Sequence, residues 1–92
     1  MVTIRVAEEA DEKLVDAYQR LTPQLSSSSP APTTDELNEI IRSDSASVLI
    51  AEDDNGEILG SMTLVLFRIP TGVRAWIEDV VVDTEARGMG IG

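Results

Sequence analysis

The segment Arg87-Gly88-Met89-Gly90-Ile91-Gly92 has the residue types in this sequence that are best suited to binding chemistry. Glycine lacks a Cβ atom, so the backbone at Gly88, Gly90 and Gly92 can adopt positive φ and come close to a bound anion. Successive backbone N–H groups can then point at one phosphate. The segment follows residues 75–83, an apolar run rich in β-branched residues that is typical of a strand. This order predicts a phosphate-binding loop after a strand.

Glu78 is the second residue that could carry chemistry, because it lies in a strand made otherwise of Trp76, Ile77 and valines. A carboxylate in such a strand is either exposed to solvent or buried for a structural or functional role. Partial burial raises the pKa of a carboxyl group toward that of a useful general base. The alternatives are a structural acid and a salt bridge on one face of the sheet, for instance with Arg74. Strand alternation points Asp79 to the opposite face and makes it the weaker candidate.

The composition excludes several classes of protein. The 92 residues fit one small domain and contain no cysteine and no histidine. This excludes a disulfide framework, a thiol nucleophile, an imidazole base and the common zinc ligand sets. No basic region is followed by a long apolar run, and no stretch approaches the roughly 20 apolar residues of a spanning helix. These features predict a cytoplasmic protein that is neither secreted nor inserted in a membrane.

The charge balance is strongly acidic, with 17 acidic side chains against 7 basic ones and a net charge of −10. A surface of this kind repels nucleic acid and anionic membranes, so we expect neither as a partner. The acidic surface either favours a cationic acceptor or serves solubility alone. Only the surroundings of Arg87 are expected to attract an anion.

The elements that must position these residues begin with a short alternating strand at residues 3–7. A helix is expected over residues 8–21, because apolar residues recur at helical intervals at Leu14, Tyr18 and Leu21. Pro23 is expected to end this helix. The serine-rich segment 26–32 is then either a mobile gate or a plain connector. The spacing Thr33-Thr34-Asp35-Glu36 is that of a capping box and predicts a second helix to about residue 42.

The remaining elements are strands. Residues 47–52 and 58–67 flank Asn55-Gly56, a pair that favours a tight hairpin turn, so these two strands should pair antiparallel. Pro70-Thr71-Gly72 predicts another turn before the strand at 75–83. We therefore predict an α+β fold in the order β-α-α-β-β-β, with two helices packed on a mixed, mostly antiparallel sheet of about four strands. The antiparallel hairpin argues against a dinucleotide-binding fold, which needs a parallel sheet and its glycines after the first strand.

This element order, together with Arg87, Gly90 and Gly92 after the strand 77–82, resembles the amino-terminal half of the GNAT superfamily of N-acetyltransferases. The three residues fit that family's Arg/Gln-x-x-Gly-x-Gly/Ala signature. The resemblance covers residues 1–92 and implies that they form the amino-terminal part of a single acetyltransferase domain. It also implies that the helix after the loop and the strands that close the acceptor pocket lie outside these residues.

The resemblance implies transfer of an acetyl group from acetyl-CoA, the co-substrate, to an amine acceptor, either a small molecule or a peptide. In the family, the strand holds the pantetheine arm and the loop holds the pyrophosphate. These roles fall on Val80 and Val82 of the strand and on Arg87, Gly88, Met89, Gly90, Ile91 and Gly92 of the loop. Taken alone, the valine run would be a buried core strand.

A strand glutamate at or near the position of Glu78 often relays the proton of the attacking amine in this family, so the resemblance makes Glu78 the candidate base. The family's usual general acid is a tyrosine in the carboxy-terminal half, and Tyr18 does not match it. The alternative to an enzyme is a non-catalytic fragment or split subunit that pairs through an exposed strand. On either reading we expect an exposed edge at residues 75–83 to favour a homodimer of these 92 residues alone.

Overall fold

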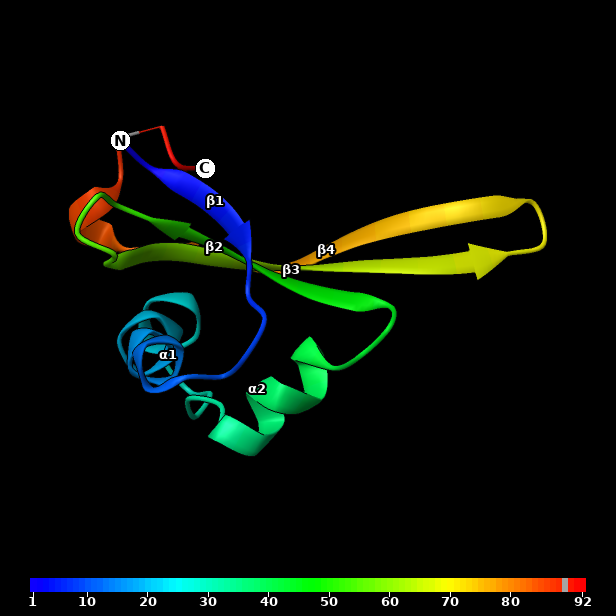
Figure 1. Cartoon of the computed structure of the whole chain (residues 1–92), viewed down its shortest axis with the longest axis horizontal. Coiled ribbons are helices and arrows are strands. Elements are labelled where there is room, and N and C mark those ends of the chain that lie inside the picture. The colour runs from blue at the N-terminus through cyan, green and yellow to red at the C-terminus, as the bar shows by residue number, and fades with distance from the viewer. Residues whose placement is uncertain (89) are drawn as a thin grey trace.

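The computed structural model describes residues 1–88 and 90–92 and shows a four-stranded sheet with two helices on one face (Figure 1). The strands are β1 (Thr3–Val6), β2 (Ala46–Glu52), β3 (Ile58–Ile69) and β4 (Gly72–Val82), paired in the order β1-β2-β3-β4. The helices are α1 (Glu12–Leu25), α2 (Thr34–Ile41) and a short 3₁₀ turn, η1 (Thr84–Ala86). Every pairing among these strands is antiparallel. The predicted α+β class and element order are confirmed.

Helix α1 begins and ends later than the sequence pattern predicts. Its N-cap is Asp11, whose carboxylate accepts a hydrogen bond from the Leu14 N–H at 2.9 Å, so residues 8–10 lie before the helix. The prediction that Pro23 ends the helix is wrong, because Pro23 lies inside it. Proline forfeits its own N–H bond, and the last turn still closes through the Ser26 N–H and the Thr22 carbonyl at 2.9 Å.

Helix α2 begins with the predicted capping box. The Glu36 N–H donates to the Thr33 hydroxyl at 3.1 Å, and the Glu36 carboxylate accepts from the Thr33 N–H at 2.9 Å. This reciprocal pair satisfies two of the backbone donors that a helix start leaves free. The helix ends at Ile41, with Arg42 as its C-cap.

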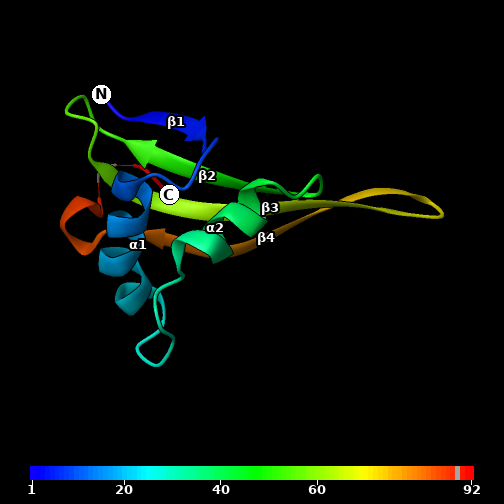
Figure 2. The ribbon, with the colours of Figure 1, turned by 60° about the horizontal axis from the view of Figure 1, so that its bottom comes forward.

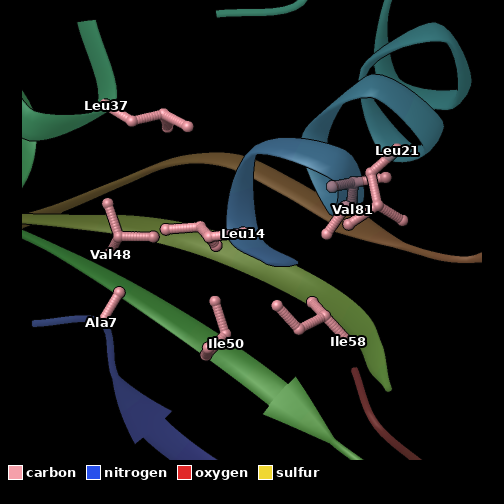
Figure 3. Close-up of a cluster of buried hydrophobic side chains, with 9 residues drawn as sticks. Ala7, Leu14, Leu21, Leu37, Val48, Ile50, Ile58 and Val81 are labelled. Atoms are coloured by element: carbon pink, nitrogen blue, oxygen red, sulfur yellow. The ribbon is translucent and has the colours of Figure 1, made fainter. Parts of the chain in front are cut away.

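The hydrophobic core lies between the helices and one face of the sheet (Figures 2 and 3). Its largest fully buried side chains come from both helices and from the central strand β2: Leu14, Leu21, Leu37, Val48 and Ile50. Val81 of β4 joins the same cluster. Each side chain of this size stabilises the fold by about 1.5–3 kcal/mol through its burial. The core therefore ties α1 to the end of β4 that precedes the glycine-rich loop.

Two tight turns connect the last three strands. The predicted turn at Asn55-Gly56 is present, and Gly56 has a φ of 78° there. Strands β3 and β4 extend further than predicted, because only Pro70 and Thr71 separate them. Their hairpin projects beyond the two helices and gives the molecule its long axis of 42 Å (Figure 1).

A β-bulge interrupts β4 at Asp79 and Val80. Glu78 pairs with Thr63 and Val81 pairs with Ser61, so two residues of β4 stand opposite one residue of β3. Asp79 has a φ of 52° and is the only non-glycine residue with positive φ among the described residues. The regular alternation on which the prediction for Asp79 rests is therefore interrupted at that residue. Glu78 and Val81 share the face of the sheet on which the helices lie, although they are three residues apart.

Candidate cofactor cleft

A cleft of 710 Å³ lies between the carboxyl end of β4, the last turn of α1 and the glycine-rich loop. Its volume is within the usual range of small-molecule sites. Every described residue that the sequence predicts to hold the cofactor lines this cleft: Val80, Val82, Arg87, Gly88, Gly90, Ile91 and Gly92. Met89, the remaining predicted residue, lies outside the described part of the chain. The fold thus gathers residues from β4 and the loop around one space.

The glycines of the loop hold a backbone conformation that favours glycine. Gly88 has a φ of 93° and Gly90 a φ of 78°. A Cβ atom built at either position would have no atom within 4 Å among the described residues beyond its chain neighbours, so packing against the rest of the fold does not explain the absence of side chains there. Side chains at these positions would instead enter open space beside the cleft. A loop of this kind suits a ligand that must approach the backbone closely, such as a phosphate group.

Arg87 gives the cleft its positive charge. It is the only charged side chain among the described lining residues, on a chain of net charge −10. The Arg87 Nε–H donates to the Val82 carbonyl oxygen at 3.1 Å, which fixes the guanidinium beside the end of β4. Arginine carries five N–H donors, so others remain for an anion. The cleft therefore carries a local positive charge on an otherwise acidic protein.

Ile91 anchors the end of the loop on the sheet face opposite the helices. A Cβ atom placed on Gly60 of β3 would lie 3.6 Å from the Ile91 Cγ2 atom and 3.0 Å from the Val81 carbonyl oxygen. Ile91 also lines a smaller apolar cavity of 220 Å³ on this face, with Ile4 and Met62 among its neighbours. The distance to Ile91 is an ordinary van der Waals contact, so the tight approach at Gly60 is to the backbone of β4 and not to the loop.

Glu78, the candidate base, lies outside the cleft lining and is exposed on the projecting part of β4. Its carboxylate accepts a hydrogen bond from the Trp76 indole N–H at 2.5 Å. Among the ion pairs of the described residues, the alternative salt bridge between Glu78 and Arg74 is not present. The Arg74 guanidinium donates instead to the Val73 carbonyl at 3.3 Å. The Asp79 bulge separates Glu78 from the valines that line the cleft.

Tyr18 and Ser61 form a polar pair between α1 and β3, next to the bulge. Their hydroxyl groups share a short hydrogen bond. Burial raises the pKa of Tyr18, the bond to Ser61 opposes this, and the nearby Asp79 carboxylate raises the pKa further. A tyrosine in the apolar stripe of a helix needs such a partner, which is the signal in the sequence that points to this pair.

Four lining residues are not in the predicted set: Gln24, Leu25, Val81 and Ala86. The first two are missed because the sequence prediction ends the helix at Pro23. Leu25 is 41% exposed and Val80 is 53% exposed, so α1 and β4 each present an apolar side chain to the cleft. Leu25 continues the i, i+4 spacing from Leu21. Following the apolar stripe past the proline would have predicted its place on the helix.

Comparison with known proteins identifies the family. Residues 12–92 match the acetyltransferase (GNAT) family. The chain therefore belongs to the acetyltransferase (GNAT) family, and the predicted resemblance is confirmed. No curated protein matches the sequence. Within residues 1–88 and 90–92, neither helix has the length and apolar character needed to cross a lipid bilayer.

Solved structures share the fold. An aminoglycoside acetyltransferase from an uncultured soil metagenomic sample, in complex with sisomicin, superposes with a TM-score of 0.80 at 23% identity, over 99% of this chain and 62% of that one. An acetyltransferase of Trypanosoma brucei gives 0.72 at 29% identity, over 98% and 66%. A GNAT family acetyltransferase of Staphylococcus aureus gives 0.80 at 16% identity, over 98% and 68%. The chain thus spans less than two thirds of the length of the soil enzyme.

Proposed function

We propose that this chain supplies the acetyl-CoA-binding part of an N-acetyltransferase, which transfers acetyl from acetyl-CoA to an amine acceptor. The observation that carries the proposal is the cleft at the end of β4, because one space is lined by every described residue of the predicted cofactor set. Family membership supports the same assignment. The cofactor would supply an activated acetyl thioester.

Features of the cleft suit two parts of acetyl-CoA, the pantetheine arm and the pyrophosphate. Among the described strands β4 has one neighbour, β3, so the outer backbone groups near Val80 and Val82 are available to an extended pantetheine arm. The glycine conformations at Gly88 and Gly90 and the charge of Arg87 suit the pyrophosphate. Leu25 and Val80 offer apolar contact between these two regions.

The acceptor is proposed to be a small-molecule amine or a peptide amine. Two of the similar structures are aminoglycoside acetyltransferases, one of them in complex with sisomicin. A net charge of −10 favours the approach of cationic amines of this kind. A small cationic amine is therefore the first acceptor class to test.

We propose Glu78 as the general base, which would take the proton of the attacking amine. The Trp76 indole holds its carboxylate in place, and its exposure leaves it accessible to an acceptor. A Glu78→Gln substitution keeps an oxygen that can accept the indole hydrogen bond but removes the basic group. It should lower kcat by about 10²–10⁴. An unchanged kcat and pH profile would refute the role.

The test of the cofactor assignment compares two glycines that share one backbone conformation. Gly90 in the loop and Gly56 in the β2–β3 turn both have a φ of 78°. Valine is strained at both positions, but only Gly90→Val places a side chain at the cleft. In protein made from the complete reading frame that contains these residues, calorimetry should show loss of acetyl-CoA binding in Gly90→Val. Gly56→Val should retain it. Equal affinities in the two variants would refute the assignment.

A non-catalytic role is the second candidate, and the exposed outer edge of β4 favours it. A subunit of this kind would use the edge to pair with another chain. An assay of thiol release from acetyl-CoA with a panel of amines distinguishes the two roles. Turnover by the complete protein at roughly 1 s⁻¹ or above, the low end of ordinary enzymes, would favour the acetyltransferase.

A further inference from the structure

Two side chains of α1, Arg20 and Gln24, hold the turn from which the glycine-rich loop starts. They are four residues apart and so lie on the same side of the helix. Their partners are Asp83 and Thr84, which follow β4 directly. Helix α1 therefore contacts the chain at the point where β4 ends and the loop begins.

Arg20 forms the stronger of the two contacts. Its Nε–H donates to the Asp83 Oδ2 atom at 2.9 Å, and its guanidinium also donates to the Ile58 carbonyl. Asp83 is only 6% exposed, and its other oxygen accepts from the Glu85 N–H at 3.1 Å. The backbone bond from Glu85, and then the bond from Arg20, keep the pKa of Asp83 below its usual value. One oxygen of Asp83 thus caps η1, and the other ties η1 to α1.

Gln24 forms the second contact. Its side-chain carbonyl accepts from the Thr84 N–H at 2.7 Å and from the Thr84 hydroxyl at 2.8 Å. Its amide group donates to the Arg20 carbonyl at 3.3 Å, which keeps the side chain along the helix. Gln24 also lines the cleft, although its oxygen is engaged by Thr84.

These contacts matter because a glycine-rich loop has little to fix it otherwise. Beyond η1, the described contacts of the loop are the Arg87 bond to the Val82 carbonyl and the packing of Ile91 near Gly60. A flexible loop must be ordered when it binds a ligand, and that ordering weakens the affinity. Anchoring Asp83 and Thr84 shortens the segment that remains to be ordered.

We propose that Arg20 and Gln24 are positioning residues that fix the glycine-rich loop for the pyrophosphate of acetyl-CoA. The proposal rests on the proposed function, because it takes the loop as the pyrophosphate site. Neither side chain needs to contact the cofactor. They act through Asp83 and Thr84, which determine where the loop leaves the sheet.

A second ion pair provides a matched control for the stability that any such contact adds. Arg5 of β1 and Glu52 of β2 are joined at 2.6 Å, and the arginine side chain is 40% exposed, as it is in Arg20. The carboxylate partners are also similar, at 15% exposure for Glu52 and 9% for Asp83. Neither Arg5 nor Glu52 lines the cleft. Removing Arg5 should therefore weaken the fold without moving the loop.

The experiment measures CoA affinity by calorimetry for Arg20→Gln, Gln24→Met and Arg5→Gln in protein from the complete reading frame. Loss of a charge-assisted hydrogen bond at the loop should weaken CoA binding about tenfold in Arg20→Gln. Loss of the uncharged hydrogen bonds between Gln24 and Thr84 should weaken CoA binding about threefold in Gln24→Met. The CoA affinity of Arg5→Gln should stay within about twofold of the wild type. Its melting temperature should fall by about as much as that of Arg20→Gln.

Amide hydrogen exchange supplies a readout that does not depend on the ligand. Exchange at residues 84–88 should accelerate in Arg20→Gln and Gln24→Met, while exchange in the β1–β2 pair stays as in the wild type. Arg5→Gln should show the reverse pattern. Equal CoA affinities in Arg20→Gln and Arg5→Gln, or unchanged exchange at 84–88, would overturn the proposal. If Arg20→Gln does not fold, Gln24→Met decides the question by the same two measurements.

A truncated donor separates this proposal from the proposed function. S-acetylpantetheine keeps the thioester but lacks the pyrophosphate and the nucleotide attached to it. If the wild-type protein binds CoA no more tightly than S-acetylpantetheine in competition, the pyrophosphate assignment itself fails. If the wild type requires the pyrophosphate and Arg20→Gln keeps wild-type affinity for CoA, only the positioning role fails.

Discussion

The two parts of β4 on either side of the Asp79 bulge differ in what surrounds them. Residues 73–78 are exposed, pair with β3 and project beyond the helices (Figure 1). After the bulge, Val81 is only 5% exposed and packs in the core beneath α1. One strand thus has a first part held mainly by backbone pairing and a second part held by packing.

This difference shows which part of β4 is fixed by packing against the rest of the fold. The packed part leads directly into the cleft, and the Arg20–Asp83 pair extends the same support to η1. The projecting part carries Trp76 and Glu78 on a surface that is open to solvent. The bulge therefore separates a packed part of β4, which lines the cleft, from an exposed part of the same strand.

The largest expected effect concerns the projecting part. Its outer edge has no strand partner among the described residues, and Trp76 and Ile77 are 57% and 55% exposed. The sequence predicts an exposed edge over residues 75–83, and a bulge at Asp79 interrupts it in the structure. We still expect the isolated 92-residue polypeptide to dimerise through this region. Sedimentation equilibrium should show a dimer that Ile77→Lys disrupts, and a wild-type monomer at high micromolar concentration would contradict this.

The second prediction compares one residue type on the two sides of the bulge. Val81 is 5% exposed and Val73 is 57% exposed. Val81→Ala should lower the free energy of unfolding by about 2 kcal/mol, because it removes two buried methyl groups and leaves a cavity. Val73→Ala should change it by less than about 0.5 kcal/mol. Urea unfolding measures both, and similar losses would show that the two parts are packed alike.

The third prediction concerns the bulge itself. With a φ of 52°, Asp79 needs a residue that tolerates the left-handed region. Asp79→Asn should keep wild-type stability, because asparagine tolerates this conformation, whereas Asp79→Val should lose about 1–2 kcal/mol. Thermal unfolding of the two variants measures this difference in stability. A valine variant as stable as the asparagine variant would mean that the bulge relaxes at little cost.

The smallest effect is expected far from β4, at Glu52. Hydrogen bonds from Arg5, and then from Lys13, lower the pKa of Glu52 from 4.5 to about 2. The ion pairs therefore stabilise the fold above pH 4.5, and this contribution disappears as the pH falls from 4.5 toward 2. In a Glu52→Gln variant, the fall in stability over that interval should be shallower by about 1 kcal/mol or less. A variant with the same pH dependence as the wild type would show that another carboxylate is responsible.

The sequence predicts well those features that depend on a few adjacent residues. The Asn55-Gly56 turn and the Thr33–Glu36 capping box follow from local hydrogen bonding and from the conformations that those residues tolerate. The glycine-rich loop and the valines before it also meet at one cleft, because they are close in sequence and the strand fixes their direction.

Features that depend on tertiary packing could not be predicted in this way. Pro23 stays within α1 because the turn around it can still close and Leu25 reaches the cleft. The bulge at Asp79 reflects how β4 must pack on α1 while pairing with β3. The contacts of Arg20 and Gln24 join residues about 60 positions apart, so no local pattern reveals them.

The neighbour-to-neighbour order of the sheet has a consequence for how the chain assembles during synthesis. Strand β4 follows its partner β3 after a two-residue turn, so this pair can close as soon as both strands have emerged. Strand β1 is made before the other three described strands, but its partner β2 begins 40 residues after β1 ends, beyond both helices. Closing a long loop is entropically costlier than closing a hairpin. Strand β1 can therefore take its place at the edge of this sheet only after α1, α2 and β2 have been made.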